Sequence, residues 1–88
     1  MEFIHEPGRI YAQDESGKVI AEITFPIENG VATIDHTFVD GSLRGQGVAG
    51  KLMAAAVEEI RKAGLKANPT CSYAVKWLAD HPENSDIM

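Results

Sequence analysis

The segment GSLRGQGVAGKLMAAAVEEI, residues 41–60, passes from a glycine-rich stretch into an amphipathic pattern without a break. Its first ten residues include four glycines, and each glycine costs about 0.5–1 kcal/mol in chain entropy. Apolar residues then recur at helical spacing, which predicts a helix over about Gln46–Ala63. The predicted buried stripe is Val48, Leu52, Met53, Ala56, Val57 and Ile60. Gly64 follows the last periodic residue, as a helix C-cap glycine does.

The chain before this helix is predicted to form three strands. GRIYAQ (residues 8–13), KVIAEITF (18–25) and VATIDHTFV (31–39) are rich in β-branched and aromatic residues. The glycine of DESG suits a turn between the first two, and Pro26 predicts a bend or an edge at the end of the second. Asn29-Gly30 predicts a hairpin turn, because both residues tolerate positive φ. The three strands are therefore expected to form an antiparallel meander with the third strand central.

The chain after the helix supplies another strand and another helix. LKANPT (residues 65–70) is a short strand candidate, and CSYAVKWLADH (71–81) predicts a helix with Ser72 or Thr70 as its N-cap. A strand, a crossover helix and a strand give a right-handed parallel pair. We therefore expect a mixed α/β fold of the α+β kind, in one domain over residues 1–88. The polar tail, about residues 82–88, is expected to be loosely ordered.

Composition and charge exclude several classes of protein. A chain of 88 residues is enough for one domain. Its net charge of −5 argues against a general nucleic-acid binder. The single cysteine, Cys71, cannot form an internal disulfide and fits a reducing compartment. With no apolar run of membrane-spanning length and no signal-peptide pattern, we expect a cytoplasmic protein without a membrane partner. A monomer and a weak dimer are both compatible with the sequence.

The glycines at the junction of strand and helix have two interpretations. They leave backbone N–H groups uncovered at a helix N-terminus, and together these groups make a cradle for phosphate. Arg44 adds a guanidinium that can fork onto phosphate oxygens. The alternative is a loop whose glycines merely permit a tight turn. The segment is neither a P-loop, since GKS and GKT are absent, nor a dinucleotide motif, since no full βαβ unit surrounds it.

Three blocks of this sequence resemble a known family. Residues 44–49, RGQGVA, resemble the Arg/Gln-x-x-Gly-x-Gly/Ala signature of the GNAT superfamily of acetyl-CoA-dependent N-acetyltransferases. With IDHTFV before it and CSYA after the next strand, the chain is similar, over about Ile10 to His81, to a small GNAT-like subfamily of single-domain proteins. The resemblance implies a truncated GNAT-like fold, with a long central helix and a short C-terminal one. It also implies that acetyl-CoA donates an acetyl group to an amine acceptor, which is a small molecule or a protein.

The same resemblance implies which residues contact coenzyme A. The residues around its pyrophosphate would be Arg44, Gly45, Gln46, Gly47, Val48 and Ala49, with contacts from Gly50 and Lys51 nearby. Phe38 and Val39 would offer main-chain hydrogen bonds to the pantetheine arm. Cys71 and Ser72 would lie where the thiol end of the coenzyme passes.

Two residues are candidates for catalysis. Cys71 is either a nucleophile, with a pKa lowered by the helix N-terminus, or a small buried residue between strand and helix. His36 is either a base near neutrality or a packed residue, since period two places it on one face with Ile34 and Phe38. Tyr73 is an acid toward the leaving thiolate or, in the favoured interpretation, a core residue. No spacing of histidine and cysteine indicates a metal site.

Departures from the GNAT pattern keep a second function open. Typical members carry two helices after the first strand, which shape the acceptor site, and a C-terminal hairpin. This chain has only a turn where those two helices would be, and it lacks the C-terminal hairpin. A shallow, open acceptor site is therefore expected. The alternative function is a non-catalytic coenzyme A-binding module that acts as a sensor or a partner-binding subunit. An interaction module using a sheet edge is a weaker alternative, because it leaves the glycine loop unexplained.

Overall fold

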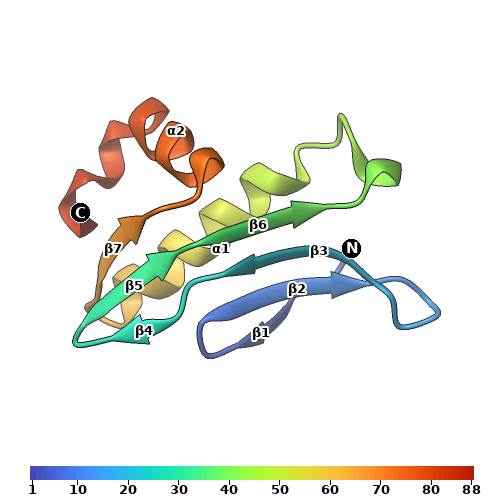
Figure 1. Cartoon of the computed structure of the whole chain (residues 1–88), viewed down its shortest axis with the longest axis horizontal. Helices are drawn as coiled ribbons and strands as arrows, with labels where there is room; N and C mark the ends of the chain where they lie inside the picture. The colour runs from blue at the N-terminus through green and yellow to red at the C-terminus, as the bar shows by residue number, and fades with distance from the viewer.

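Two small sheets share one long helix in the computed structural model, which describes residues 1–88 (Figure 1). The strands are β1 (Ile4–Glu6), β2 (Arg9–Gln13), β3 (Val19–Thr24), β4 (Ile27–Glu28), β5 (Val31–Ile34), β6 (His36–Val39) and β7 (Lys66–Pro69). The helices are η1 (Gly41–Leu43), α1 (Val48–Lys62), α2 (Ser72–Asp80) and η2 (Pro82–Ile87). One sheet has the order β1-β2-β3-β6 and the other β4-β5-β7.

The predicted meander and parallel pair are both confirmed. Strand β3 pairs antiparallel with β2 on one side and with β6 on the other, and β5 pairs parallel with β7. Asn29 and Gly30 have φ of 51° and 78°, so the hairpin between β4 and β5 uses the positive φ that these residues tolerate. Strand β1 was not predicted. It has three exposed residues and pairs with β2 through a tight turn, so it carries no alternating pattern to read.

A β-bulge divides the third predicted strand into β5 and β6. The backbone N–H of Asp35 donates to the carbonyl of Thr24, which already faces His36 in the register of β3 and β6. Asp35 is therefore an extra residue, and an extra residue moves every later side chain to the opposite face. Ile34 is buried, but the His36 side chain is 53 % exposed on the outer face. The prediction that His36 and Phe38 share a face with Ile34 is wrong for this reason.

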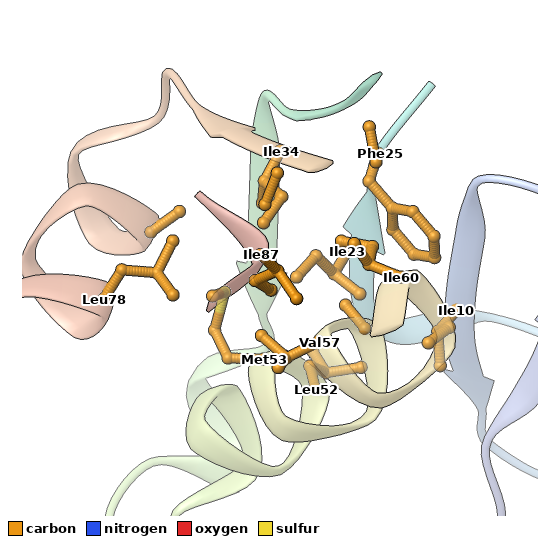
Figure 2. Packing of buried hydrophobic residues seen from close by; sticks show 14 of the residues in the cluster. Ile10, Ile23, Phe25, Ile34, Leu52, Met53, Val57, Ile60, Leu78 and Ile87 are labelled. Atoms are coloured by element: carbon orange, nitrogen blue, oxygen red, sulfur yellow. The ribbon is translucent and has the colours of Figure 1, made fainter. Parts of the chain in front are cut away.

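Helix α1 covers the inner face of the sheets, while no helix lies in front of their outer face (Figure 1). Its buried residues are the six predicted: Val48, Leu52, Met53, Ala56, Val57 and Ile60. They pack against Ile10, Ile23 and Ile34 from the strands (Figure 2). Gly64, with φ of 71°, ends the helix as predicted. The N–H of Gly64 donates to the carbonyl of Arg61, and the N–H of Leu65 donates to the carbonyl of Ile60. This pair of hydrogen bonds is a Schellman motif.

The N-cap of α2 differs from the prediction. Neither Ser72 nor Thr70 caps the helix; Cys71 does, and its Sγ accepts a hydrogen bond from the N–H of Ala74 at 3.4 Å. Thr70 instead continues the pairing with β5, because its N–H donates to the carbonyl of Ile34. None of the helices has the length and apolar character that a membrane span requires.

The C-terminal tail packs on the domain, contrary to the prediction of a loose tail. Ile87 is 3 % exposed and belongs to the core cluster, where it lies beside Met53 (Figure 2). Arg61 of α1 donates to both carboxylate oxygens of Asp86, at 3.0 and 3.1 Å, and to Asn84 at 2.9 Å. One apolar anchor and one forked ion pair therefore hold a segment whose composition is polar.

Acid should weaken this attachment. The hydrogen bond from Arg61 holds the pKa of Asp86 below its ordinary value, so the charged pair stabilises the fold above that value and is lost as pH falls through the lowered pKa. In thermal melts, Arg61→Ala should lower the midpoint at pH 7 and flatten the decline of the midpoint below about pH 4. Lys62→Ala, which removes an exposed neighbouring charge, is the control. Identical pH profiles for the two variants would contradict the assignment.

Candidate functional site

The glycine-rich loop connects the end of β6 to the start of α1, at one end of the molecule (Figure 1). Asp40 begins it by accepting hydrogen bonds from the N–H and hydroxyl of Ser42, at 3.0 and 2.6 Å. A pocket of about 240 Å³ lies against the loop. Its walls are Val39, Leu43, Arg44, Gly45, Gly47, Val48, Ala49, Gly50 and Tyr73. Most of these residues are those that the sequence assigned to a phosphate cradle.

Backbone N–H groups without an acceptor gather in this pocket. The first hydrogen bond of α1 runs from the N–H of Lys51 to the carbonyl of Gly47. Within the protein, no hydrogen bond satisfies the N–H groups of Gly45, Gly47, Val48, Ala49 and Gly50. Gly45 and Gly47 have φ of 80° and 71°, which only glycine adopts readily. The loop therefore presents a cluster of donors at the positive end of a helix dipole.

Arg44 is a free cation at the rim of the pocket. Its backbone N–H donates to Gly41, but its guanidinium takes part in no hydrogen bond or ion pair of the protein. By contrast, Arg9 and Arg61 are both paired with carboxylates. The pocket thus combines uncommitted N–H donors with an uncommitted positive charge, which is the arrangement that binds phosphate groups.

The free edge of β6 runs into the same pocket. The N–H of Asp40 donates to the carbonyl of Ile20 on the β3 side. In an antiparallel ladder, successive residues alternate between pointing their main-chain groups toward the partner strand and away from it. The main-chain groups of Phe38 therefore face β3, and those of Val39 and Thr37 face away from it. On the outward side no strand follows, because the pairing of β7 ends at Pro69, opposite Ile34. Val39 and Thr37 therefore offer open ladder positions, whereas Phe38 exposes only its ring, on the outer face.

Helix α2 closes the pocket from the other side with Tyr73. The sequence favoured a core position for this residue, but it is 37 % exposed and its hydroxyl lies near Gly50. Partial burial raises the pKa of its phenol, so the hydroxyl keeps its proton at neutral pH. The indole nitrogen of Trp77 also approaches Gly50, and its ring stacks on His81 with centroids 3.8 Å apart. A larger residue at position 50 would narrow the gap between the two helices.

Neither candidate catalytic residue lines the pocket, and the two are not hydrogen-bonded to each other. Cys71 is half-buried, next to β5, and its N–H donates to the carbonyl of Ile34 at 3.2 Å. His36 lies on the outer face, where its Nε2 is 3.5 Å from Oε1 of Glu22. Arg9 donates to the other oxygen of the same carboxylate at 2.6 Å. The structure thus gives His36 a carboxylate partner that the sequence did not indicate.

The remaining predicted residues are exposed and do not form the wall. Gln46 uses its backbone N–H to hold the turn, by donating to Leu43. Lys51 lies in the first turn of α1, Ser72 is the first residue of α2, and both are exposed. Leu43 and Tyr73 line the pocket in their place. The sequence feature that could have placed Tyr73 at the pocket is its position in the first turn of the helix after the parallel strand β7.

Comparison with known proteins identifies the family. A family model described as GCN5-related N-acetyl-transferase matches residues 9–87, which include every strand except β1, the loop and both α-helices. The chain belongs to this family. A GCN5-like protein from Staphylococcus aureus, solved by NMR, is 36 % identical with a TM-score of 0.81, over 98 % of this chain and 85 % of its own. The GCN5-related fold is therefore present over nearly the whole chain.

A further solved structure and two curated sequences are also similar to this chain. Tetrahymena GCN5 has a TM-score of 0.65 at 16 % identity, over 82 % of this chain and 48 % of its own. Protein NATD1 of Xenopus tropicalis is 38 % identical over 55 residues, and that of Homo sapiens 35 % over 52. These matches cover 60 % and 59 % of this chain. The matched part of this chain spans about half the length of these curated relatives, 50 % and 46 %.

Proposed function

We propose that this GCN5-related chain binds acetyl-CoA at the glycine-rich loop and transfers the acetyl group to an amine. The observation that carries the proposal is the cluster of five uncommitted N–H groups beside the free guanidinium of Arg44. The pyrophosphate of coenzyme A is a doubly charged ligand that fits such a cluster. Gln46 and Lys51 flank the site, and the acyl arm would extend from it along β6.

The open ladder of β6 supports a path for that arm. Main-chain groups of Val39 and Thr37 have no strand partner, and the amides of a pantetheine arm are groups that pair with such an edge. The arm would then run toward the N-terminus of α2, where Cys71 and Ser72 begin the helix. Phe38 borders this path with its ring rather than with its main chain.

The chemistry assigned to Cys71 is attack on the thioester. The Cys71 thiol would give its proton to water, and its sulfur would form a bond to the acetyl carbon while the bond from that carbon to the coenzyme sulfur breaks. The leaving thiolate would take a proton from the hydroxyl of Tyr73, which would regain one from water. The acceptor amine, deprotonated by His36 or by water, would then take the acetyl group and release Cys71. The Glu22 carboxylate, 3.5 Å from the Nε2 atom of His36, would orient the imidazole. The single-cysteine composition fits this chemistry in a reducing compartment such as the cytoplasm.

One observation favours the second candidate, a coenzyme A-binding module without turnover. None of the three cavities of the structure includes His36 or Cys71 in its walls, so no enclosed acceptor site lies beside them. An assay for free coenzyme A thiol, with acetyl-CoA and a panel of lysine peptides and polyamines, separates the two functions. Amine-dependent thiol release with acetylated product supports the transferase. Saturable binding of acetyl-CoA with no release of thiol, whichever acceptor is added, would support the coenzyme A-binding module instead.

Arg44→Ala should weaken acetyl-CoA binding about three- to tenfold without changing the thermal midpoint, because the exposed guanidinium takes part in no hydrogen bond or ion pair of the protein. The loss should shrink as salt is raised, since the site is exposed. Lys62→Ala removes the same charge at the far end of α1 and should leave affinity unchanged. Equal affinities for Arg44→Ala and the wild type would remove Arg44 from the site.

A further inference from the structure

A second cavity lies at the opposite end of α1. It has a volume of about 540 Å³, the largest of the three, which is within the range of small-molecule sites. Its apolar walls come from Phe25, Ile27, Ile60, Ala63 and Leu65, and its polar rim from the β1–β2 turn, His5, Glu59 and Lys62. Phe25 and Ile60 mark its position in Figure 2. The length of α1 separates it from the glycine-rich loop by about 20 Å, so it is not part of the site described above.

One carboxylate oxygen in this cavity has no hydrogen-bond partner. Oε2 of Glu59 is covered from solvent and unpaired, and it is the only buried side-chain nitrogen or oxygen in the protein of which this is true. Its other oxygen, Oε1, is 3.3 Å from Nδ1 of His5. A covered, unpaired acceptor costs free energy until a donor reaches it. Since the terminal torsion of glutamate is soft, a small rotation presents this oxygen to the cavity.

The other charges around the cavity are already engaged. Glu6 accepts from Arg9 at 3.1 Å, and the ammonium of Lys62 is 3.7 Å from Glu58. The cavity also adjoins the C-terminus of α1, where the helix dipole is negative. Because Oε1 of Glu59 already contacts His5, its Oε2 is the one covered carboxylate oxygen at the cavity that can still accept from a cation.

We propose that this cavity is a binding site for a small organic ammonium ion with an apolar body. The ammonium group donates to Glu59, and the apolar body lies against Phe25, Ile27 and Leu65. Ile27 is 47 % exposed and so offers apolar surface at the mouth of the cavity. Cys71 and the residues of the glycine-rich loop are not among the walls of this cavity, so the site is separate from the one proposed for acetyl-CoA.

The test is a titration of ¹⁵N-labelled full-length protein with phenethylammonium chloride, followed by amide chemical shifts. Saturable shifts are expected at Gly8, Ala63 and Leu65, with none at Gly45 or Gly47. 2-Phenylethanol, a neutral molecule of nearly the same shape, should bind about tenfold more weakly, since a charged hydrogen bond is lost.

Two variants localise the effect to one carboxylate. Glu59→Gln should weaken phenethylammonium binding about tenfold and abolish the preference for the ammonium over the alcohol. Glu15→Gln removes an exposed acidic charge from the turn between β2 and β3, which does not line the cavity, and should bind as the wild type does. Absence of saturable shifts at the cavity, equal binding of amine and alcohol, or equal losses in both variants would each overturn the proposal.

Discussion

Gly47→Val is expected to weaken acetyl-CoA binding by at least about tenfold. Gly47 is the N-cap of α1 and has φ of 71°, a conformation that a β-branched residue adopts at a cost of about 1–3 kcal/mol. The loop relieves that strain by turning its backbone, which moves the N–H groups of Gly47 and Val48 out of the cluster. A Cβ atom at this position would meet no other group within 4 Å, so the core is undisturbed. Affinity is measured by calorimetry and folding by the amide spectrum.

Gly17→Val is the matched control for this variant. Gly17 also has positive φ, 89°, and equally open surroundings, but it lies in the turn between β2 and β3. Both variants should lose a similar amount of stability, while only Gly47→Val should lose affinity. A Gly47→Val protein that is folded and binds acetyl-CoA as the wild type does would show that the loop is only a helix start.

Cys71→Ser is expected to reduce acetyl transfer by about a hundredfold or more while leaving the fold intact. Cys71 has two roles that this change separates. As an N-cap, its sulfur accepts a weak hydrogen bond from Ala74, and a serine hydroxyl performs that role at least as well. As a nucleophile, a thiolate is far more reactive than a neutral hydroxyl. The rate of thiol release and the thermal midpoint are measured on the same preparation.

Cys71→Ala completes the comparison. It removes both the nucleophile and the cap, so it should lose activity and also about 1 kcal/mol of stability. Acetyl-CoA affinity should be retained in both variants, because the phosphate cradle is on the other helix. A Cys71→Ser protein with the wild-type rate would assign Cys71 to capping alone and leave direct transfer to the amine as the mechanism.

Local patterns predicted the parts of the fold that local physics determines. The buried stripe of α1 follows from its period, the end of the helix from Gly64, and the β4–β5 hairpin from Asn29 and Gly30. The meander and the parallel pair then follow from chain order and handedness. The loop was identified as a candidate site for the same reason, because its glycines and Arg44 lie together in the sequence.

The errors came from contacts between distant residues. The bulge at Asp35 depends on the hydrogen bond from its N–H to the carbonyl of Thr24 on another strand, which no periodicity within one strand reveals. It moved His36 from the core face to the outer face. The tail is held by Ile87 and by the pairing of Asp86 with Arg61, 25 residues earlier in the chain. Polar composition concealed both of these long-range contacts.

The central claim is that the glycine-rich loop binds the pyrophosphate of coenzyme A. The most direct measurement is a calorimetric titration of the unmodified protein with acetyl-CoA, alongside adenosine and dephosphorylated analogues of the coenzyme. We predict micromolar binding of acetyl-CoA that is retained by analogues with the pyrophosphate and lost with adenosine alone. Absence of binding, or equal binding of adenosine, would contradict the assignment of the loop and, with it, the acetyltransferase function.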